Sequence, residues 1–309
     1  MNLRSFLQFI RWKNLLMIAL IQLLFKYVYF PTFNIATELD HFHFFILILA
    51  TLSIAAAGNI INDIYDIEAD LINKPQKVLV TKRISIKHAN NLYLILNAVG
   101  ILLGLYVAFE IHRISFVAIF IITALLLNVY SASLKKKPII GNLVVSLLIS
   151  LSILIVGVFD LIPAISDTNG ITQYLGFWGL LDYAIFAFMF NFLREMVKDI
   201  EDVEGDLKLN MNTLPILIGR KKTKKVIFLL AFFPLGVVTY YSFDNFSKLP
   251  LVLVYMLIVV LFPFLLFMTK LLYSEEKKHY RYLSRLLKLI MLLGMFSIVL
   301  ISISIHYAQ

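Results

Sequence analysis

Runs of about twenty apolar residues recur along the whole chain, and they constrain its fold more than any other feature. Apolar residues make up 61% of the 309, and the mean hydropathy is +0.87. A helix needs roughly twenty such residues to cross a bilayer, so the chain is predicted to be an all-α, polytopic membrane protein. Nine transmembrane helices are expected, at Asn14–Phe30, Phe42–Ile61, Ala89–Phe109, Ile114–Tyr130, Ile140–Leu161, Tyr174–Leu193, Val226–Tyr241, Leu249–Met268 and Leu286–Ile305.

Positive charge is distributed unevenly between the loops that join these spans. If the N-terminus is cytoplasmic, 25 of the 28 Lys and Arg residues fall at the cytoplasmic side, and only Lys26, Arg113 and Lys248 do not. This positive-inside pattern predicts that the N-terminus faces the cytoplasm. The richness in Phe, Ile and Lys suggests a prokaryotic membrane. The first span contains Lys26 and lacks a small-residue cleavage site, so it is expected to be a retained helix.

Charge and cysteine content exclude several classes of function. The net charge of +9 is dispersed between the spans, which disfavours nucleic-acid binding and suits contact with anionic membrane lipids. Because there are no cysteines, disulfides, thiolate metal sites and cysteine nucleophiles are excluded. No loop is long enough to form a soluble domain, so residues 1–309 are predicted to form one membrane domain with an internal pseudo-repeat.

An acidic phrase occurs twice, as DIYDIEADL at Asp63–Leu71 and as DIEDVEGDL at Asp199–Leu207. Its three aspartates recur 136 positions later, as the pairs Asp63 and Asp199, Asp66 and Asp202, and Asp70 and Asp206. On a helix their spacing places all three on one face, which the preceding Asn62 shares with two of them. Two such faces brought together would crowd six carboxylates, which only cations make tolerable. Oxygen ligands of this kind suit Mg²⁺ together with a phosphorylated substrate.

Both phrases are expected at the cytoplasmic end of an even-numbered span, where each runs into a polar loop. A simpler interpretation is that they are solvated charges at helix ends, but the repeated register disfavours it. A structural calcium site is a second alternative, and the spacing of an EF-hand loop is missing.

Basic and polar side chains near the phrases have the chemistry to hold a diphosphate. The candidates for substrate binding are Lys74, Lys77, Tyr130, Lys135, Arg194 and Lys198.

The sequences NDIYDIEAD, YSASLK and KDIEDVEGD resemble the UbiA superfamily of intramembrane prenyltransferases over the whole chain. The resemblance implies nine transmembrane helices around a central cavity, with Mg²⁺ and a prenyl diphosphate bound by two aspartate-rich motifs. REMVKDIEDVEGD followed by NTLPILIG is most similar to the digeranylgeranylglyceryl phosphate synthase branch. The chain departs from that branch at Gln76–Leu79 and at Trp12-Lys13.

Carried over residue by residue, the resemblance implies roles for the motif residues. The metal ligands would be Asn62, Asp66, Asp70, Asp202 and Asp206, with Asp63 and Asp199 as supporting acids. Lys74 and Lys135 would hold the diphosphate, and Arg11 and Asn14 would shape the acceptor end. The catalytic set would be Asp66, Asp70, Asp202, Asp206 and Lys135.

The function expected from this resemblance is Mg²⁺-dependent transfer of a prenyl group, geranylgeranyl in this branch, to a lipid hydroxyl. The acceptor would be a prenylglyceryl phosphate, and the products an ether lipid and diphosphate. One alternative is prenylation of an aromatic acceptor in quinone or haem biosynthesis. Another is a divalent-cation transporter that uses the acidic pairs as a permeation site.

Overall fold

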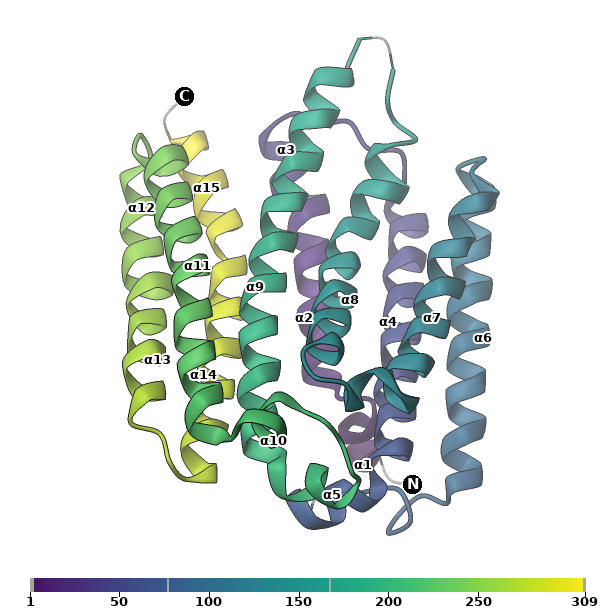
Figure 1. Cartoon of the computed structure of the whole chain (residues 1–309). Helices are drawn as coiled ribbons and strands as arrows, with labels where there is room; N and C mark the ends of the chain where they lie inside the picture. The colour runs from purple at the N-terminus through teal and green to yellow at the C-terminus, as the bar shows by residue number, and fades with distance from the viewer. Residues whose placement is uncertain (1–2, 77, 167, 308–309) are drawn as a thin grey trace.

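The computed structural model describes residues 3–76, 78–166 and 168–307. Within these ranges the regular elements are all helices (Figure 1). They are α1 (Leu3–Phe9), α2 (Trp12–Leu24), η1 (Phe25–Tyr29), α3 (Phe30–Thr32), α4 (His41–Tyr65), α5 (Ile67–Asn73), α6 (Ile86–Glu110), η2 (Ile114–Phe116), α7 (Val117–Ala132), η3 (Leu134–Lys136), α8 (Ile140–Val156), η4 (Gly157–Leu161), α9 (Gly170–Lys208), α10 (Leu214–Ile218), α11 (Arg220–Phe246), α12 (Pro250–Tyr255), η5 (Met256–Leu261), α13 (Phe262–Leu272), α14 (Lys277–Met295) and α15 (Ser297–His306).

Nine helical segments in the described ranges are long and apolar enough to cross a membrane. Each overlaps one of the nine predicted spans, so the expected number and order of transmembrane helices are confirmed. The chain is therefore an integral, multi-pass membrane protein. The segments are Trp12–Thr32, His41–Tyr65, Ile86–Glu110, Ile114–Ala132, Ile140–Leu161, Gly170–Lys208, Arg220–Phe246, Pro250–Leu272 and Lys277–His306.

The sixth span differs most from its predicted range, which was Tyr174–Leu193. It is the 39-residue helix α9, which continues through the second acidic phrase to Lys208. A helix of this length extends about 58 Å, whereas the hydrocarbon core of a bilayer is about 30 Å thick. The prediction that the second phrase runs into a polar loop is therefore wrong, because the phrase itself is helical to its end. Helical hydrogen bonding continues past the end of the apolar run and holds the second phrase on a rigid extension.

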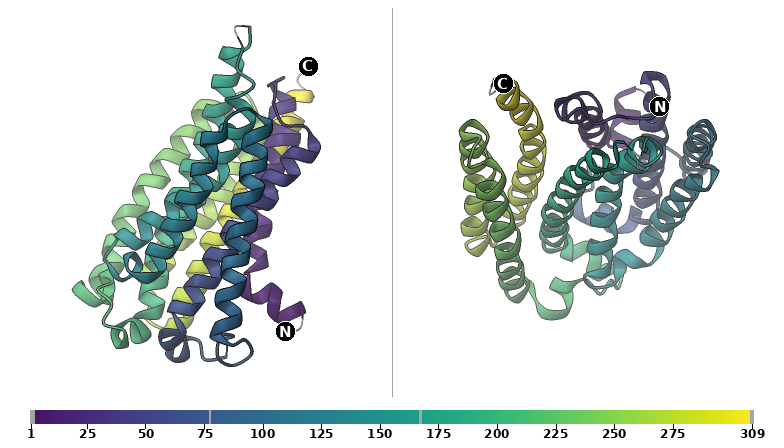
Figure 2. Two further views of the ribbon diagram at one scale, coloured as in Figure 1. Left: turned by 90° about the vertical axis from the view of Figure 1, so that its right-hand side faces the viewer. Right: turned by 90° about the horizontal axis from the view of Figure 1, so that it is seen from above.

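The spans stand side by side, with α9 between two groups of helices (Figures 1 and 2). It packs against α8 on one side and against α11 and α14 on the other, while α4 packs against α6 and α7. The first described helix, α1, lies at the lower end of the bundle in Figure 1, together with α5 and α10. The lower end is also where both acidic phrases lie.

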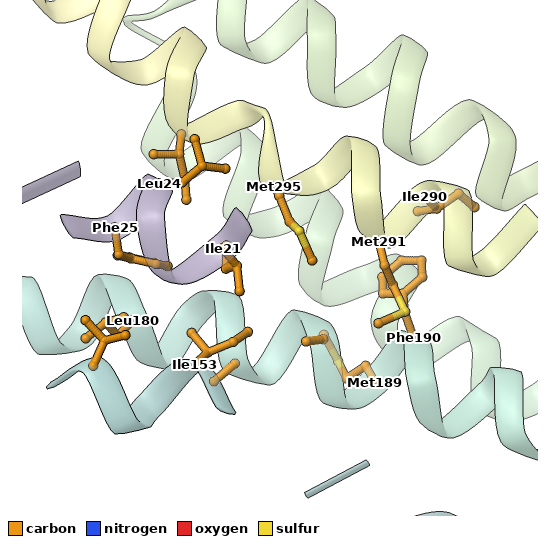
Figure 3. Close-up of a cluster of buried hydrophobic side chains, with 14 of the residues drawn as sticks. Ile21, Leu24, Phe25, Ile153, Leu180, Met189, Phe190, Ile290, Met291 and Met295 are labelled. Atoms are coloured by element: carbon orange, nitrogen blue, oxygen red, sulfur yellow. The ribbon is translucent and has the colours of Figure 1, made fainter. Parts of the chain in front are cut away.

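Apolar side chains from α2, α8, α9 and α14 meet inside the bundle (Figure 3). Ile21, Ile153, Phe190 and Met295 are all buried there. Phe190 also contacts Phe264 of α13, with the ring centroids 4.8 Å apart. Lipid tails are as apolar as these side chains, so the hydrophobic effect does not drive the helices together within a bilayer. Close van der Waals packing holds them together instead.

A buried ion pair joins the first span to the fifth. Lys26 Nζ lies 2.9 Å from Asp160 Oδ2, and the two side chains are 6% and 0% exposed. Lys26 also donates to the carbonyl of Leu39, whose own N–H donates to Asp160 Oδ1 at 2.7 Å. Both charged residues lie in π-helical turns, η1 and η4, which are rare and often occur at functional sites.

We expect Lys26→Met to lower the free energy of unfolding by about 3–5 kcal/mol, because it leaves Asp160 charged, buried and unpaired. Thermal unfolding in detergent micelles, followed by tryptophan fluorescence, measures the change. The double variant Lys26→Met/Asp160→Asn should recover most of the loss, because asparagine is neutral and still accepts from Leu39. A double variant as unstable as the single one would show that the unpaired charge is not the cause.

Candidate active site

A cavity of about 250 Å³ lies between α2, α4, α7, α8, α9 and α14. Most of its wall is apolar and includes Met17, Ile54, Phe120 and Leu148. Polar residues line it near the lower ends of these helices: Arg11, Asn14, Asn59, Asn62, Tyr130, Asn191, Arg194, Glu195, Lys198 and Lys288. The expected central cavity is thus present, with a long apolar part and one charged end.

The first acidic phrase lies on two helices and not on one. Helix α4 ends at Tyr65 and α5 begins at Ile67, so Asp66 sits at the junction. The expectation that all three aspartates share one continuous helical face is therefore wrong for this phrase. Asp66 accepts from Asn62 Nδ2 at 2.7 Å and from Lys135 Nζ at 2.5 Å. Because Asn62 lines the cavity, Asp66 adjoins the charged end of the cavity.

The second acidic phrase is helical throughout, on the lower part of α9. Asp199 accepts from Asn142 Nδ2 of α8 at 2.8 Å. One turn further, Asp202 Oδ2 accepts from Lys74 Nζ at 2.6 Å. Asp206 is buried and lies within electrostatic range of both Asp202 and Asp66. The two phrases therefore face each other, as their repeated spacing predicts.

Asn73, at the end of α5, holds the two phrases together. Its Nδ2 donates to the carbonyl of Asp202 at 2.8 Å, and its Oδ1 accepts from the N–H of Gly205 at 3.0 Å. The close approach depends on Gly205, because a Cβ there would lie 2.3 Å from Asn73 Nδ2 and 2.6 Å from the carbonyl of Ala69. This contact fixes the separation between the phrases.

We expect Gly205→Ala to destabilise the protein by about 1–3 kcal/mol, because the added methyl group overpacks the contact between α5 and α9. The matched control is Gly236→Ala on α11, where an added Cβ meets nothing within 4 Å. Alanine favours a helix, so the control should be as stable as the parent protein or slightly more stable. Equal melting temperatures for the two variants would contradict the tight contact.

The prediction that six carboxylates crowd together around cations is wrong for the described residues. Among the described residues, no three His, Cys, Asp or Glu side chains form a group that could hold one metal ion. The physical reason is that the chain supplies its own partners. Arg11 donates to Asp63 at 2.6 Å, while Lys135, Asn142 and Lys74 donate to three of the other aspartates.

The residues nevertheless fit a hard divalent cation. Asp202 Oδ1 is buried and has no hydrogen-bond partner within the part of the chain that the structure describes. Asp206 lies within electrostatic range of both Asp202 and Asp66, and carboxylate oxygens are the ligands that Mg²⁺ prefers. Which of the seven predicted ligands bind a metal stays a prediction.

Lys74, one of the two predicted diphosphate-binding lysines, is kept charged by a neighbouring aspartate. Burial would lower the pKa of Lys74, but Asp202 outweighs it and the pKa is raised, so Lys74 stays protonated. Burial raises the pKa of Asp70 to about 6, with smaller effects from its neighbours. Asp70 is thus largely ionised at neutral pH. Lys135 is the more enclosed lysine, with a side chain 9% exposed.

Comparison with known proteins gives the family. The sequence model of the UbiA prenyltransferase family matches residues 19–301. The chain belongs to the UbiA prenyltransferase family. Membership excludes the cation-transporter alternative and agrees with the expected nine-helix fold.

Relatives of this UbiA protein include the digeranylgeranylglyceryl phosphate synthase of Sulfolobus acidocaldarius, which is 36% identical over 180 residues. That match covers 58% of this chain and 59% of the relative, so the chain spans less than two thirds of it. A solved structure that describes the biosynthesis of digeranylgeranylglyceryl phosphate synthase in membranes has a TM-score of 0.65 at 26% identity, and the match covers 97% of this chain and 98% of that one. A UbiA homolog from Archaeoglobus fulgidus bound to DMAPP and Mg²⁺ has a TM-score of 0.56 at 16% identity, covering 96% and 99%, and shares the fold.

The remaining predicted site residues of this UbiA protein lie in three places. Arg11, Asn14, Tyr130, Arg194 and Lys198 line the cavity. Arg194 and Lys198 share one carboxylate, because Glu195 accepts from Arg194 at 2.7 Å and from Lys198 at 2.8 Å. No role was predicted for Glu195 from the sequence. Lys77 lies outside the described residues.

Sequence reasoning missed several residues of the site. Asn73, Asn142 and Glu195 were given no role, although Glu195 lies within the quoted sequence REMVKDIEDVEGD. Lys288 was counted only as an orientation charge, yet it lines the cavity and donates to Asn14 Oδ1. The signal that could have found Lys288 is its place inside the predicted span Leu286–Ile305, because a charged residue within a membrane span usually has a function.

Proposed function

We propose that this protein transfers a geranylgeranyl group from its diphosphate to the hydroxyl of a prenylglyceryl phosphate. The observation that carries the proposal is the pairing of the two acidic phrases at the charged end of an apolar cavity. The name of the Sulfolobus acidocaldarius relative supports this choice of acceptor. The whole chain, residues 1–309, acts as one prenyltransferase domain.

In the reaction, the bond between C1 of the prenyl group and the diphosphate oxygen breaks, and the acceptor oxygen forms an ether bond to C1. The hydroxyl proton leaves with the diphosphate. Lys74 and Lys135 bind the diphosphate, and the apolar wall of the cavity keeps water from the electron-poor prenyl carbon. Phe and Tyr side chains offer that carbon an electron-rich surface.

Mg²⁺ is the metal proposed for the site, held by Asn62, Asp66, Asp70, Asp202 and Asp206. When bound, it neutralises charge on the leaving diphosphate. The Archaeoglobus fulgidus homolog, solved with DMAPP and Mg²⁺, supports a divalent metal beside a prenyl diphosphate in this fold. Asp63 and Asp199 support the site by fixing Arg11 and Asn142.

The site faces the cytoplasm of a prokaryotic cell in this proposal. The positive-inside distribution of Lys and Arg supports that orientation, since the N-terminal arm and the loops predicted to be cytoplasmic hold 25 of the 28. Membrane lipids surround the helices, and no nucleic acid takes part.

The test uses membranes that contain the protein, labelled geranylgeranyl diphosphate, Mg²⁺ and two kinds of acceptor. With a geranylgeranylglyceryl phosphate acceptor we expect an ether product carrying a second geranylgeranyl group, identified by its mass. Membranes with Asp202→Asn serve as the inactive control. A product formed only from an aromatic acceptor would overturn the proposal in favour of quinone or haem biosynthesis.

A further inference from the structure

Four cationic side chains line the same end of the cavity. Arg11 precedes α2, Arg194 and Lys198 lie one turn apart on α9, and Lys288 lies on α14. Helix α14 packs against both α9 and α2, which brings the four together. Lys288 is within electrostatic range of Arg11, Arg194, Lys198 and the nearby Lys13.

The four cations outnumber the carboxylates with which they form ion pairs. Arg11 pairs with Asp63, and Arg194 and Lys198 share the single carboxylate of Glu195. Lys288 donates to Asn14, which is neutral. Among the described residues, four cations and one carboxylate, that of Glu195, thus line a cavity whose wall is largely apolar.

One donor in this cluster also lacks an acceptor. Arg194 Nε is buried and has no hydrogen-bond partner among the described residues. A buried, unpaired donor on a charged group is costly unless a ligand satisfies it. The surplus charge and the free donor both point to an anion.

The cluster is separate from the residues proposed to hold the diphosphate. Lys74 and Lys135 bind Asp202 and Asp66, and neither these lysines nor their aspartates line the cavity. Along α9, Lys198 lies one turn, about 6 Å, before Asp202 and therefore deeper in the bundle. The apolar wall beside it includes Met291 and Met295, whose side chains appear in Figure 3.

We infer that Lys288, Arg194 and Lys198, with Asn14, bind the phosphate monoester of the acceptor lipid. The inference rests on the proposed function and adds the place where the acceptor is recognised. A phosphate held here positions the acceptor on the cavity side of the acidic phrases, with its prenyl chain along the apolar wall. The donor diphosphate is then bound on the opposite side of the transferred carbon.

The experiment uses the full chain in nanodiscs of a zwitterionic lipid, so that no bulk lipid carries a phosphate monoester. The variants are Lys288→Gln and Lys198→Gln, and the matched control is Lys222→Gln, an exposed lysine of α11. We expect KM for the acceptor to rise about 10- to 100-fold in the first two variants, because a charge-assisted hydrogen bond is lost. KM for the donor should change less than twofold.

A second arm measures binding without turnover. With neither Mg²⁺ nor donor present, the phosphorylated acceptor should raise the melting temperature of the parent protein and of Lys222→Gln. It should raise that of Lys288→Gln much less. The acceptor without its phosphate should stabilise all three proteins equally. If Lys288→Gln fails to fold, Lys198→Gln and the conservative Lys288→Arg carry both arms.

The outcomes separate the possible ligands. A rise in KM for the donor alone would show that the cluster holds the diphosphate and would overturn the inference. Equal loss of binding with and without the acceptor phosphate would overturn it as well, since it would show a purely structural role for Lys288. If the parent protein forms no ether product but binds the phosphorylated acceptor through Lys288, the proposed function fails and the phosphate site stands.

Discussion

Replacing Asp202 with asparagine is expected to lower prenyl transfer by about a thousandfold. Asp202 binds Lys74 through one carboxylate oxygen, and its other oxygen is buried with no partner among the described residues, so it contributes a fixed negative charge where a cation is required. Removing a single preorganised electrostatic group from an active site typically costs about 10²–10³ in rate. Asparagine keeps the shape of the side chain, and therefore the fold should persist.

Release of diphosphate at saturating donor, acceptor and Mg²⁺ measures this effect. The control is Asp244→Asn, an exposed residue near the far end of α11, which should leave turnover unchanged. Asp66→Asn should cost as much as Asp202→Asn, and the double variant should lose little more, because groups that act as one unit are not additive. Retention of more than a tenth of the activity in Asp202→Asn would contradict its assignment.

The nine spans could be predicted because the bilayer fixes how many apolar residues a helix needs to cross it. The ends of the helices could not be predicted, since main-chain hydrogen bonding can continue in a helix beyond the last apolar residue. The clearest case is α9, where the sequence indicated an end near Leu193 and the helix continues to Lys208. That continuation carries the second acidic phrase.

The pairing of the two phrases was visible in the sequence, because a repeated spacing predicts two matching surfaces. The contacts that hold them were not visible. Asn73 forms hydrogen bonds with Asp202 and Gly205, which are 129 and 132 residues away in the sequence. Lys26 binds Asp160, which is 134 residues away. Such contacts depend on how distant helices pack, and neither local propensity nor hydropathy records them.

The break between α4 and α5 shows the same limit at short range. The spacing of Asp63, Asp66 and Asp70 predicts one helical face, and the main-chain hydrogen bonds from Asp66 to Asn62 and from Asp70 to Asp66 keep that spacing almost intact. Asp66 nevertheless takes a non-helical conformation, with φ −94° and ψ 4°. Its contact with Lys135, 69 positions away, lies outside any local pattern.

Lys135→Gln is expected to lower turnover about a hundredfold and, at the same time, to raise the affinity of the protein for Mg²⁺. Lys135 Nζ lies 2.5 Å from Asp66 Oδ1 in a largely enclosed position. A lysine and a divalent cation that bind the same carboxylate compete, so removing the lysine frees Asp66 for the metal. The turnover falls because the leaving diphosphate loses a positive partner.

The two effects are measured separately. The Mg²⁺-dependent rise in melting temperature, recorded without donor or acceptor, reports the affinity of the folded protein for the metal. Turnover is recorded at saturating Mg²⁺, so that weaker or tighter metal binding does not affect it. The control is the adjacent and exposed Lys136→Gln, which carries the same change of charge in the same loop and should alter neither quantity.

If Lys135→Gln weakens both Mg²⁺ binding and turnover, then Lys135 positions Asp66 for the metal and does not compete with it. The lysines beside the acidic phrases would then be part of the metal site's scaffold instead of partners for the diphosphate.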